Sequence, residues 1–138
     1  MTNHKWVLIT GANGGIGKSL VKCFLENDYK VIAVDKISAN PFDDLNVEHL
    51  HLDLEQFVAD DSYARNFIDR TTEITSGRGI FALINNAAVQ IFGHCNEVSR
   101  LMWSQSFSVN LSAPFFLIQG FLDQLSRNRG CVVNISSI

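Results

Sequence analysis

A glycine-rich segment, TGANGGIG at residues 10–17, stands between a short apolar run and a stretch with helical periodicity. The apolar run, residues 5–10, lacks polar alternation and is typical of a strand covered on both faces of a parallel sheet. One face of the following stretch, residues 15–27, is mostly apolar and carries Ile16, Leu20, Cys23 and Phe24. A second apolar run follows at residues 30–35. This order predicts a parallel βαβ unit.

The rest of the chain continues the alternation of strands and helices. Further strands are predicted at residues 47–52, 80–85 and 131–135, and helices at about 60–76 and 98–125. The Asp/Asn-rich connector that ends at Asn46 leaves room for about one helical turn. Pro114 should bend the last helix, because proline lacks a backbone donor. Right-handed crossovers with one reversal then predict an α/β fold, a Rossmann-type doubly wound parallel sheet of order 3-2-1-4-5, as one domain over residues 1–138.

Ligands in such sheets bind beyond the carboxyl ends of the strands, where the strand order reverses. The glycine-rich segment lies there, and its residues predicted to contact a dinucleotide are Gly11, Asn13, Gly15, Ile16 and Gly17. Gly11 permits a tight turn, Gly15 lets backbone approach a pyrophosphate, and Gly17 lets the helix close on the sheet. The amides at the start of the helix would face the phosphates.

An acidic residue ends the second predicted strand. Asp35 lies 20 residues after Gly15, where a carboxylate can accept both hydroxyls of an adenosine ribose and would repel a 2′-phosphate. A solvated acid at a strand end is the simpler alternative. Lys36 follows directly and can attract a phosphate. The predicted cofactor is therefore NAD, with NADP as the alternative.

Composition narrows the classes of function. The formal net charge is −3 and the basic residues are scattered, so no nucleic acid partner is expected. The apolar run at residues 6–9 is too short for a signal peptide or a membrane span, which favours a cytoplasmic protein without a membrane partner. Cys23, Cys95 and Cys131 form no CxxC pair and are expected to be reduced thiols. No metal site is predicted.

Four motifs occur in one order and spacing: TGANGGIG at 10–17, NNAA at 85–88, VNL at 109–111 and NISS at 134–137. In these motifs the whole chain resembles the classical short-chain dehydrogenases/reductases. The resemblance implies an NAD(P)-dependent oxidoreductase that interconverts a small-molecule alcohol and a ketone. An extended-type epimerase or dehydratase acting on nucleotide sugars is more remote, because the glycine spacing and the NNAA turn argue against it.

The resemblance implies further contacts with the cofactor, residue by residue. Asp53 matches the acid whose side chain contacts the adenine amino group, and Leu54 matches the neighbour whose backbone does the same. Asn86, Ala87 and Ala88 match the turn that steadies the sheet and borders the cofactor. These five residues complete the predicted binding site.

The resemblance also implies two catalytic residues. Asn110 matches the helix asparagine whose main chain holds a water in the proton relay, although an asparagine can also bond within its own helix. Ser137 matches the serine that hydrogen-bonds the substrate carbonyl, where a fixed hydroxyl stabilises developing negative charge. Ser136 is its rival, because adjacent strand residues point to opposite faces. His94 and Cys95 fall in a loop that borders the substrate in the family, and a surface loop is the simpler interpretation.

The family's general acid, a tyrosine followed by a lysine one helical turn later, has no match. Tyr29 and Tyr63 are the two tyrosines, and neither is followed four residues later by lysine. In the family this pair follows the serine. The sequence is therefore interpreted as the N-terminal, cofactor-binding part of a longer single-domain enzyme, truncated after the fifth strand and inactive by itself. A non-catalytic dinucleotide-binding module is the alternative.

Two further features bear on this interpretation. The fifth predicted strand would be an exposed apolar edge, which folded proteins usually cover, and this favours the fragment. The 98–125 helix matches the family helix that pairs with its copy across a twofold axis, which implies a homo-oligomer. Its aromatic residues can equally cover the sheet.

Overall fold

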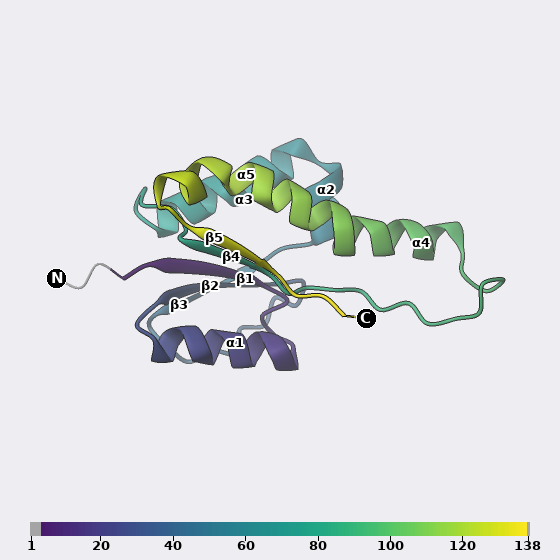
Figure 1. Cartoon of the computed structure of the whole chain (residues 1–138), viewed down its shortest axis with the longest axis horizontal. Helices are drawn as coiled ribbons and strands as arrows, with labels where there is room; N and C mark the ends of the chain where they lie inside the picture. Colours follow the sequence, from purple (N-terminus) through teal and green to yellow (C-terminus); the bar gives the residue numbers. More distant parts are fainter. Residues whose placement is uncertain (1–3, 138) are drawn as a thin grey trace.

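The computed structural model describes residues 4–137. Within this range lies a parallel sheet with the strand order β3-β2-β1-β4-β5 (Figure 1). Its strands are β1 (Trp6–Thr10), β2 (Lys30–Asp35), β3 (Val47–His51), β4 (Ala82–Asn85) and β5 (Cys131–Asn134). The predicted Rossmann-type α/β fold and its strand order are therefore confirmed.

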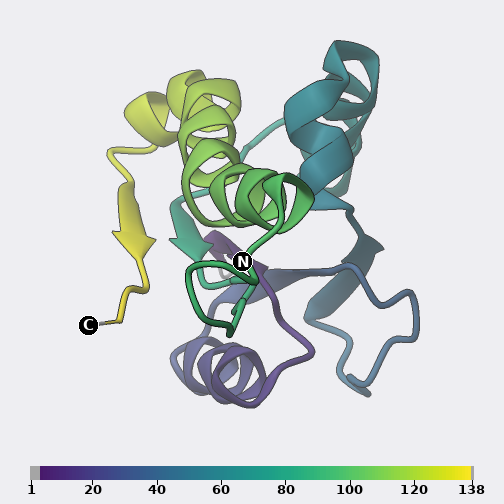
Figure 2. The same cartoon turned by 90° about the vertical axis from the view of Figure 1, so that its right-hand side faces the viewer.

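Helices cover both faces of this sheet. On one face lies α1 (Gly15–Glu26), and on the other lie α3 (Asp61–Ile74) and α5 (Ala113–Arg127) (Figure 1; Figure 2). β1 is buried along its whole length because it pairs with β2 on one side and β4 on the other. Its alternate residues serve two cores: Leu8 packs in the core beneath α3 and α5, and Val7 and Ile9 pack in the core beneath α1.

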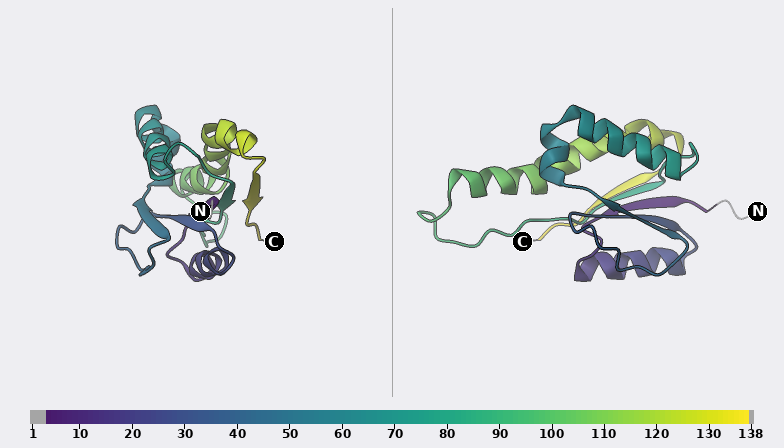
Figure 3. Two further views of the ribbon diagram at one scale, coloured as in Figure 1. Left: turned by 90° about the vertical axis from the view of Figure 1, so that its left-hand side faces the viewer. Right: turned by 180° about the vertical axis from the view of Figure 1, so that it is seen from behind.

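The strand order reverses between β1 and β4. The chain leaves β1 toward β2 and β3 on one side and returns through α3 to β4 on the other. The carboxyl ends of β1, β2 and β4 therefore meet at one edge of the sheet. The segment between β4 and α4 (Arg100–Phe107), together with α4 itself, extends beyond this edge (Figure 1; Figure 3).

A short helix that the sequence analysis did not predict follows β3. It is α2 (Leu54–Ala59), and the Oδ1 atom of Asp53 caps it by accepting the N–H groups of Glu55 and Gln56. Six residues are too few to show a clear helical periodicity, so the cap was the available signal. The next helix begins as predicted, because Asp60 accepts the N–H groups of Ser62 and Tyr63 and so caps α3.

The predicted single helix over 98–125 is divided into three parts. Between α4 and α5 lies a π-helical turn, Ser108–Ser112, closed by the N–H of Ala113 donating to the carbonyl of Ser108. Pro114 follows directly, and without an N–H it cannot bond to the carbonyl of residue 110 one turn back. The hydrogen-bond pattern of the helix therefore changes next to Pro114, and a bend at this position stays a prediction.

β5 forms one edge of the sheet and is largely exposed (Figure 2). Val133 and Ile135 are exposed to 43% and 41%. Other large apolar side chains are exposed along α4, the π turn and α5, including Trp103, Leu111 and Phe115. Among the described residues, no helix combines the length and apolar character that crossing a membrane requires.

Candidate functional site

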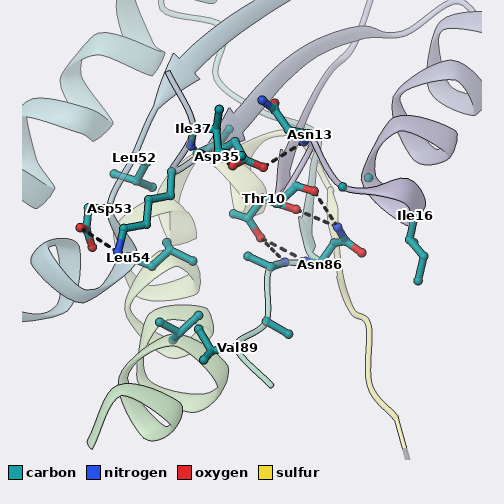
Figure 4. A pocket seen from close by; sticks show the side chains of 18 of the residues that line it. Thr10, Asn13, Ile16, Asp35, Ile37, Leu52, Asp53, Leu54, Asn86 and Val89 are labelled. Atoms are coloured by element: carbon teal, nitrogen blue, oxygen red, sulfur yellow. Dashed lines mark hydrogen bonds and ion pairs between the residues drawn. The ribbon is translucent and has the colours of Figure 1, made fainter. Parts of the chain in front are cut away.

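A cavity of about 700 Å³ lies at the carboxyl ends of β1, β2 and β4. Its walls come from the glycine-rich loop, the ends of β2 and β3, the start of α2, and residues 86–90 with Val109 (Figure 4). We call it the glycine-loop cavity. The residues predicted to contact the cofactor all line it: Gly11, Asn13, Gly15, Ile16, Gly17, Asp35, Asp53, Leu54, Asn86, Ala87 and Ala88. Its volume is typical of small-molecule and cofactor sites.

Three of the four glycines of the loop meet different surroundings. Gly11 has φ of +63°, and a Cβ there would lie 2.8 Å from the Cα of Ala87. A Cβ on Gly17 would overlap the carbonyl oxygen of Gly11 and lie 2.7 Å from the Cα of Ala12. A Cβ on Gly15 would meet nothing within 4 Å. Gly11 and Gly17 therefore serve the packing of the protein itself, whereas Gly15 faces open space.

The N-terminus of α1 opens into this cavity. Its cap residue is Gly14, and no side chain caps the helix. The N–H of Gly14 donates to the carbonyl of Gly11, which closes the turn before the helix. Amides in the first helical turn have no partner within a helix, and they carry the positive end of its dipole. This end of α1 is therefore suited to an anionic group.

Asp35 is held in place at the end of β2. Its Oδ2 accepts the N–H of Asn13 and its Oδ1 accepts the N–H of Ile37, each at 2.9 Å. A carboxylate has about four acceptor positions, so both oxygens can still accept further donors. The structure thus presents a fixed acceptor with unused capacity in the cavity wall (Figure 4).

A histidine supports the loop next to Asp35. The amide of Asn13 donates to the carbonyl of Ala39, so its Oδ1 is free to accept Nε2–H of His49 at 2.9 Å. Burial lowers the pKa of His49 below its usual value; His51 acts in the same direction and Asp35 against it. This hydrogen bond was not predicted from the sequence.

Asp53 makes two interactions that were not predicted from the sequence. Its Oδ1 caps α2, and its Oδ2 lies 3.6 Å from Nζ of Lys36. Leu54, the next residue, is buried in the cavity wall. The contact of Asp53 with an adenine amino group stays a prediction.

Thr10 joins the glycine-rich loop to the turn after β4. Its buried hydroxyl oxygen accepts the N–H groups of Asn86 at 3.1 Å and Ala87 at 3.0 Å. The amide of Asn86 donates to the carbonyls of Thr10 and Gly11. Two segments far apart in sequence are thus tied together by hydrogen bonds. Thr10 lines the cavity but was not predicted as a site residue; its place at the head of the TGANGGIG motif was the available signal.

The two predicted catalytic residues lie outside the cavity wall. Asn110 is in the π-helical turn, where its side chain accepts the N–H of Val89 at 2.8 Å and donates to the carbonyl of Val89 at 2.9 Å. It therefore bonds chiefly to the segment after β4 rather than within its own helix. Ser136 and Ser137 follow β5 and are both exposed. Their roles stay predictions.

Neither tyrosine lies in the wall of the cavity. Tyr29 packs its ring against Phe24 and Phe81 just before β2, at the opposite end of the sheet. The hydroxyl of Tyr63 accepts the N–H of Asp53 at 3.0 Å. Both positions agree with the interpretation that neither is the general acid. Among the described residues, no cluster of His, Cys, Asp and Glu is arranged to hold a metal ion.

Comparison with known proteins places these features in a family. A sequence model of the short chain dehydrogenases matches residues 5–138. Protein FixR of Bradyrhizobium diazoefficiens is 30% identical over 144 residues, which cover 97% of this chain and 50% of FixR. Acetoacetyl-CoA reductase of an Acinetobacter species is 30% identical over 149 residues, which cover 100% of this chain and 58% of the reductase.

Solved structures agree with the sequence comparisons. A 4-hydroxyisoleucine dehydrogenase complexed with NADH superimposes with a TM-score of 0.79 at 29% identity, covering 97% of this chain and 56% of the dehydrogenase. The chain spans about half the length of the relatives that it matches.

Proposed function

Since the chain belongs to the short-chain dehydrogenase family, we propose that its glycine-loop cavity binds NAD and that the protein serves the interconversion of an alcohol and a ketone. The observation that carries this proposal is the pairing, in one cavity, of an uncapped helix N-terminus with a fixed carboxylate. The helix end favours a pyrophosphate, and Asp35 can accept the hydroxyls of an adenosine ribose. NAD supplies the hydride chemistry of such a reaction when it is bound.

The loop glycines support the same proposal. Open space beside Gly15 lets the backbone approach a pyrophosphate, whereas Gly11 and Gly17 keep the turn tight. The predicted roles of Asp53 and Leu54 at the adenine, and of residues 86–88 along the cofactor, fit their places in the wall. Relatives solved with NADH or NAD favour NAD over NADP.

For the catalytic step we assign Ser137 and Asn110 the roles expected from the resemblance. A hydroxyl at Ser137 would donate to the substrate carbonyl, where negative charge develops. The main chain of Asn110 would hold a water of the proton relay. The side chain of Asn110 is fixed by Val89, which would keep this turn in place. The substrate is a small-molecule alcohol or ketone.

The general acid is the missing part of this machinery. Neither Tyr29 nor Tyr63 is placed to protonate a substrate in the cavity. We therefore propose that these 138 residues form the cofactor-binding part of a longer enzyme and are inactive alone. The exposed edge strand β5 supports this, because such edges are usually covered. A non-catalytic dinucleotide-binding module is the second candidate, favoured by the same absence of a placed tyrosine.

Two further expectations belong to this proposal. The exposed apolar side chains of α4, the π turn and α5 suit a contact between two copies of the protein, as the resemblance implies. The three cysteines are exposed and unpaired, which suits the reducing conditions of the cytoplasm.

The experiment that tests this function measures NADH binding and the mass of the native protein. Calorimetric titration with NADH should show one site, and the native protein should weigh more than the 15.4 kDa of the chain. Turnover of secondary alcohols should then require the heavier form. NADH binding by a native protein of 15.4 kDa without turnover would support the binding module instead. No binding in either form would contradict both candidates.

A further inference from the structure

Charged side chains are unevenly distributed around the glycine-loop cavity. Among the described residues that line it, Lys36 is the one cation, and Asp35, Asp53 and Glu55 are carboxylates. A cation beside Asp35 would favour the additional phosphate of NADP, since phosphate groups pair with ammonium groups. The position of the Lys36 ammonium therefore bears on which dinucleotide the cavity accepts.

The ammonium of Lys36 is paired at the start of α2. Its Nζ lies 3.6 Å from Oδ2 of Asp53 and 3.7 Å from Oε2 of Glu55. Asp35 is engaged by backbone amides instead, those of Asn13 and Ile37. Figure 4 shows Asp35 turned toward Asn13, with Asp53 set apart from both. The cation is thus shared by two carboxylates rather than offered to a group bound at Asp35.

These ion pairs contribute little to the stability of the fold. The Lys36 side chain is 68% exposed and that of Glu55 is 34% exposed, and pairs of this kind are screened by solvent. Asp53 has a second task, because its Oδ1 caps α2. Glu55 has no capping role, so it can be neutralised without removing the cap.

We propose that Glu55 is a positioning residue that sets dinucleotide selectivity by acting through Lys36. Together with Asp53 it holds the ammonium at the start of α2, so that a 2′-phosphate would meet the carboxylate of Asp35 without a cation to offset it. NAD, which has a hydroxyl at this position, is not penalised. This inference rests on the proposed NAD site. It adds that Glu55 keeps Lys36 from shifting the preference of the site toward NADP.

The test is a double-mutant cycle on the purified protein, with dissociation constants for NADH and NADPH measured by calorimetry. Glu55→Gln should lower the dissociation constant for NADPH roughly threefold, as expected for release of an exposed ion pair, and change that for NADH less than twofold. In a Lys36→Met background, Glu55→Gln should leave the NADPH constant unchanged. The matched control is Glu73→Gln, which removes the same charge from a pair with Arg70 on α3.

The possible results separate the two levels of the proposal. If Glu55→Gln lowers the NADPH dissociation constant equally with and without Lys36, Glu55 repels the phosphate directly. This result would overturn the positioning role. An unchanged ratio of the NADH and NADPH dissociation constants in Glu55→Gln would also overturn it. An equal decrease of the NADPH dissociation constant in Glu73→Gln would do the same. If the native protein binds neither dinucleotide, the proposed function fails and the inference fails with it.

Discussion

At the scale of single residues, substitutions of the loop glycines should affect either the packing of the fold or the binding of the cofactor. Gly15→Ala should leave the free energy of unfolding unchanged or slightly raised, because a Cβ there meets open space in a helix. It should weaken NADH binding roughly tenfold by blocking the approach to the pyrophosphate. Gly17→Ala should instead destabilise the fold by about 1–3 kcal/mol, because its Cβ would overlap the carbonyl of Gly11. Denaturant unfolding and calorimetric titration of both variants check this prediction. Equal changes in the free energy of unfolding and in the affinity for NADH would contradict it.

A second residue-scale prediction concerns His49. Its pKa in the folded protein is lowered, chiefly by burial, so the unfolded chain binds more protons below the ordinary value of 6.5. The contribution of His49 to stability is therefore present above pH 6.5 and is lost as the pH falls from there to the folded pKa.

His49→Gln keeps a donor for Oδ1 of Asn13 but does not titrate in this range. Urea unfolding from pH 7.5 to pH 5 should show a steeper loss of stability in the native protein than in this variant. Parallel pH profiles would show that His49 is not linked to folding.

At the scale of elements, Gln124 joins α5 to two neighbours. Its Oε1 accepts the buried N–H of Ile80 before β4, and its Nε2 donates to the hydroxyl of Thr72 on α3. Gln124→Leu would leave the Ile80 N–H unpaired and should cost about 1–3 kcal/mol of unfolding free energy. Gln119→Leu, at an exposed position of the same helix, is the control and should change it by less than about 0.5 kcal/mol. Similar values from denaturant unfolding would rule out this anchoring role.

The strands and the longer helices were the elements that the sequence could predict. β1 and β2 are continuous apolar runs, and Asp60 signals the start of α3. α2 was missed because six residues give no clear periodicity. The π turn was missed because it depends on which carbonyl accepts the N–H of Ala113, a choice that residue types alone do not specify.

At the scale of the whole molecule, the predicted contacts came together because parallel strands end at one edge. Gly11, Asp35 and Asn86 are separated in sequence, but β1, β2 and β4 bring them to one cavity. The pairing of Lys36 with Glu55 was not predictable in this way. It depends on α2, whose presence the sequence analysis did not detect.

The exposed apolar surface also belongs to this scale. β5 is an exposed edge strand, and large apolar side chains are exposed to solvent along α4 and α5. Such surfaces suit contacts with further polypeptide, either the rest of a longer enzyme or a second copy.

We propose that Asp35 binds the adenosine ribose of NAD, and the decisive measurement is a calorimetric titration of Asp35→Ala with NADH and NADPH. Loss of hydrogen bonds to a charged acceptor should weaken NADH binding about tenfold or more. NADPH should lose much less or even gain, because the repulsion of its 2′-phosphate is removed. Equal losses for the two dinucleotides would contradict the assignment of Asp35 and, with it, this account of the cavity.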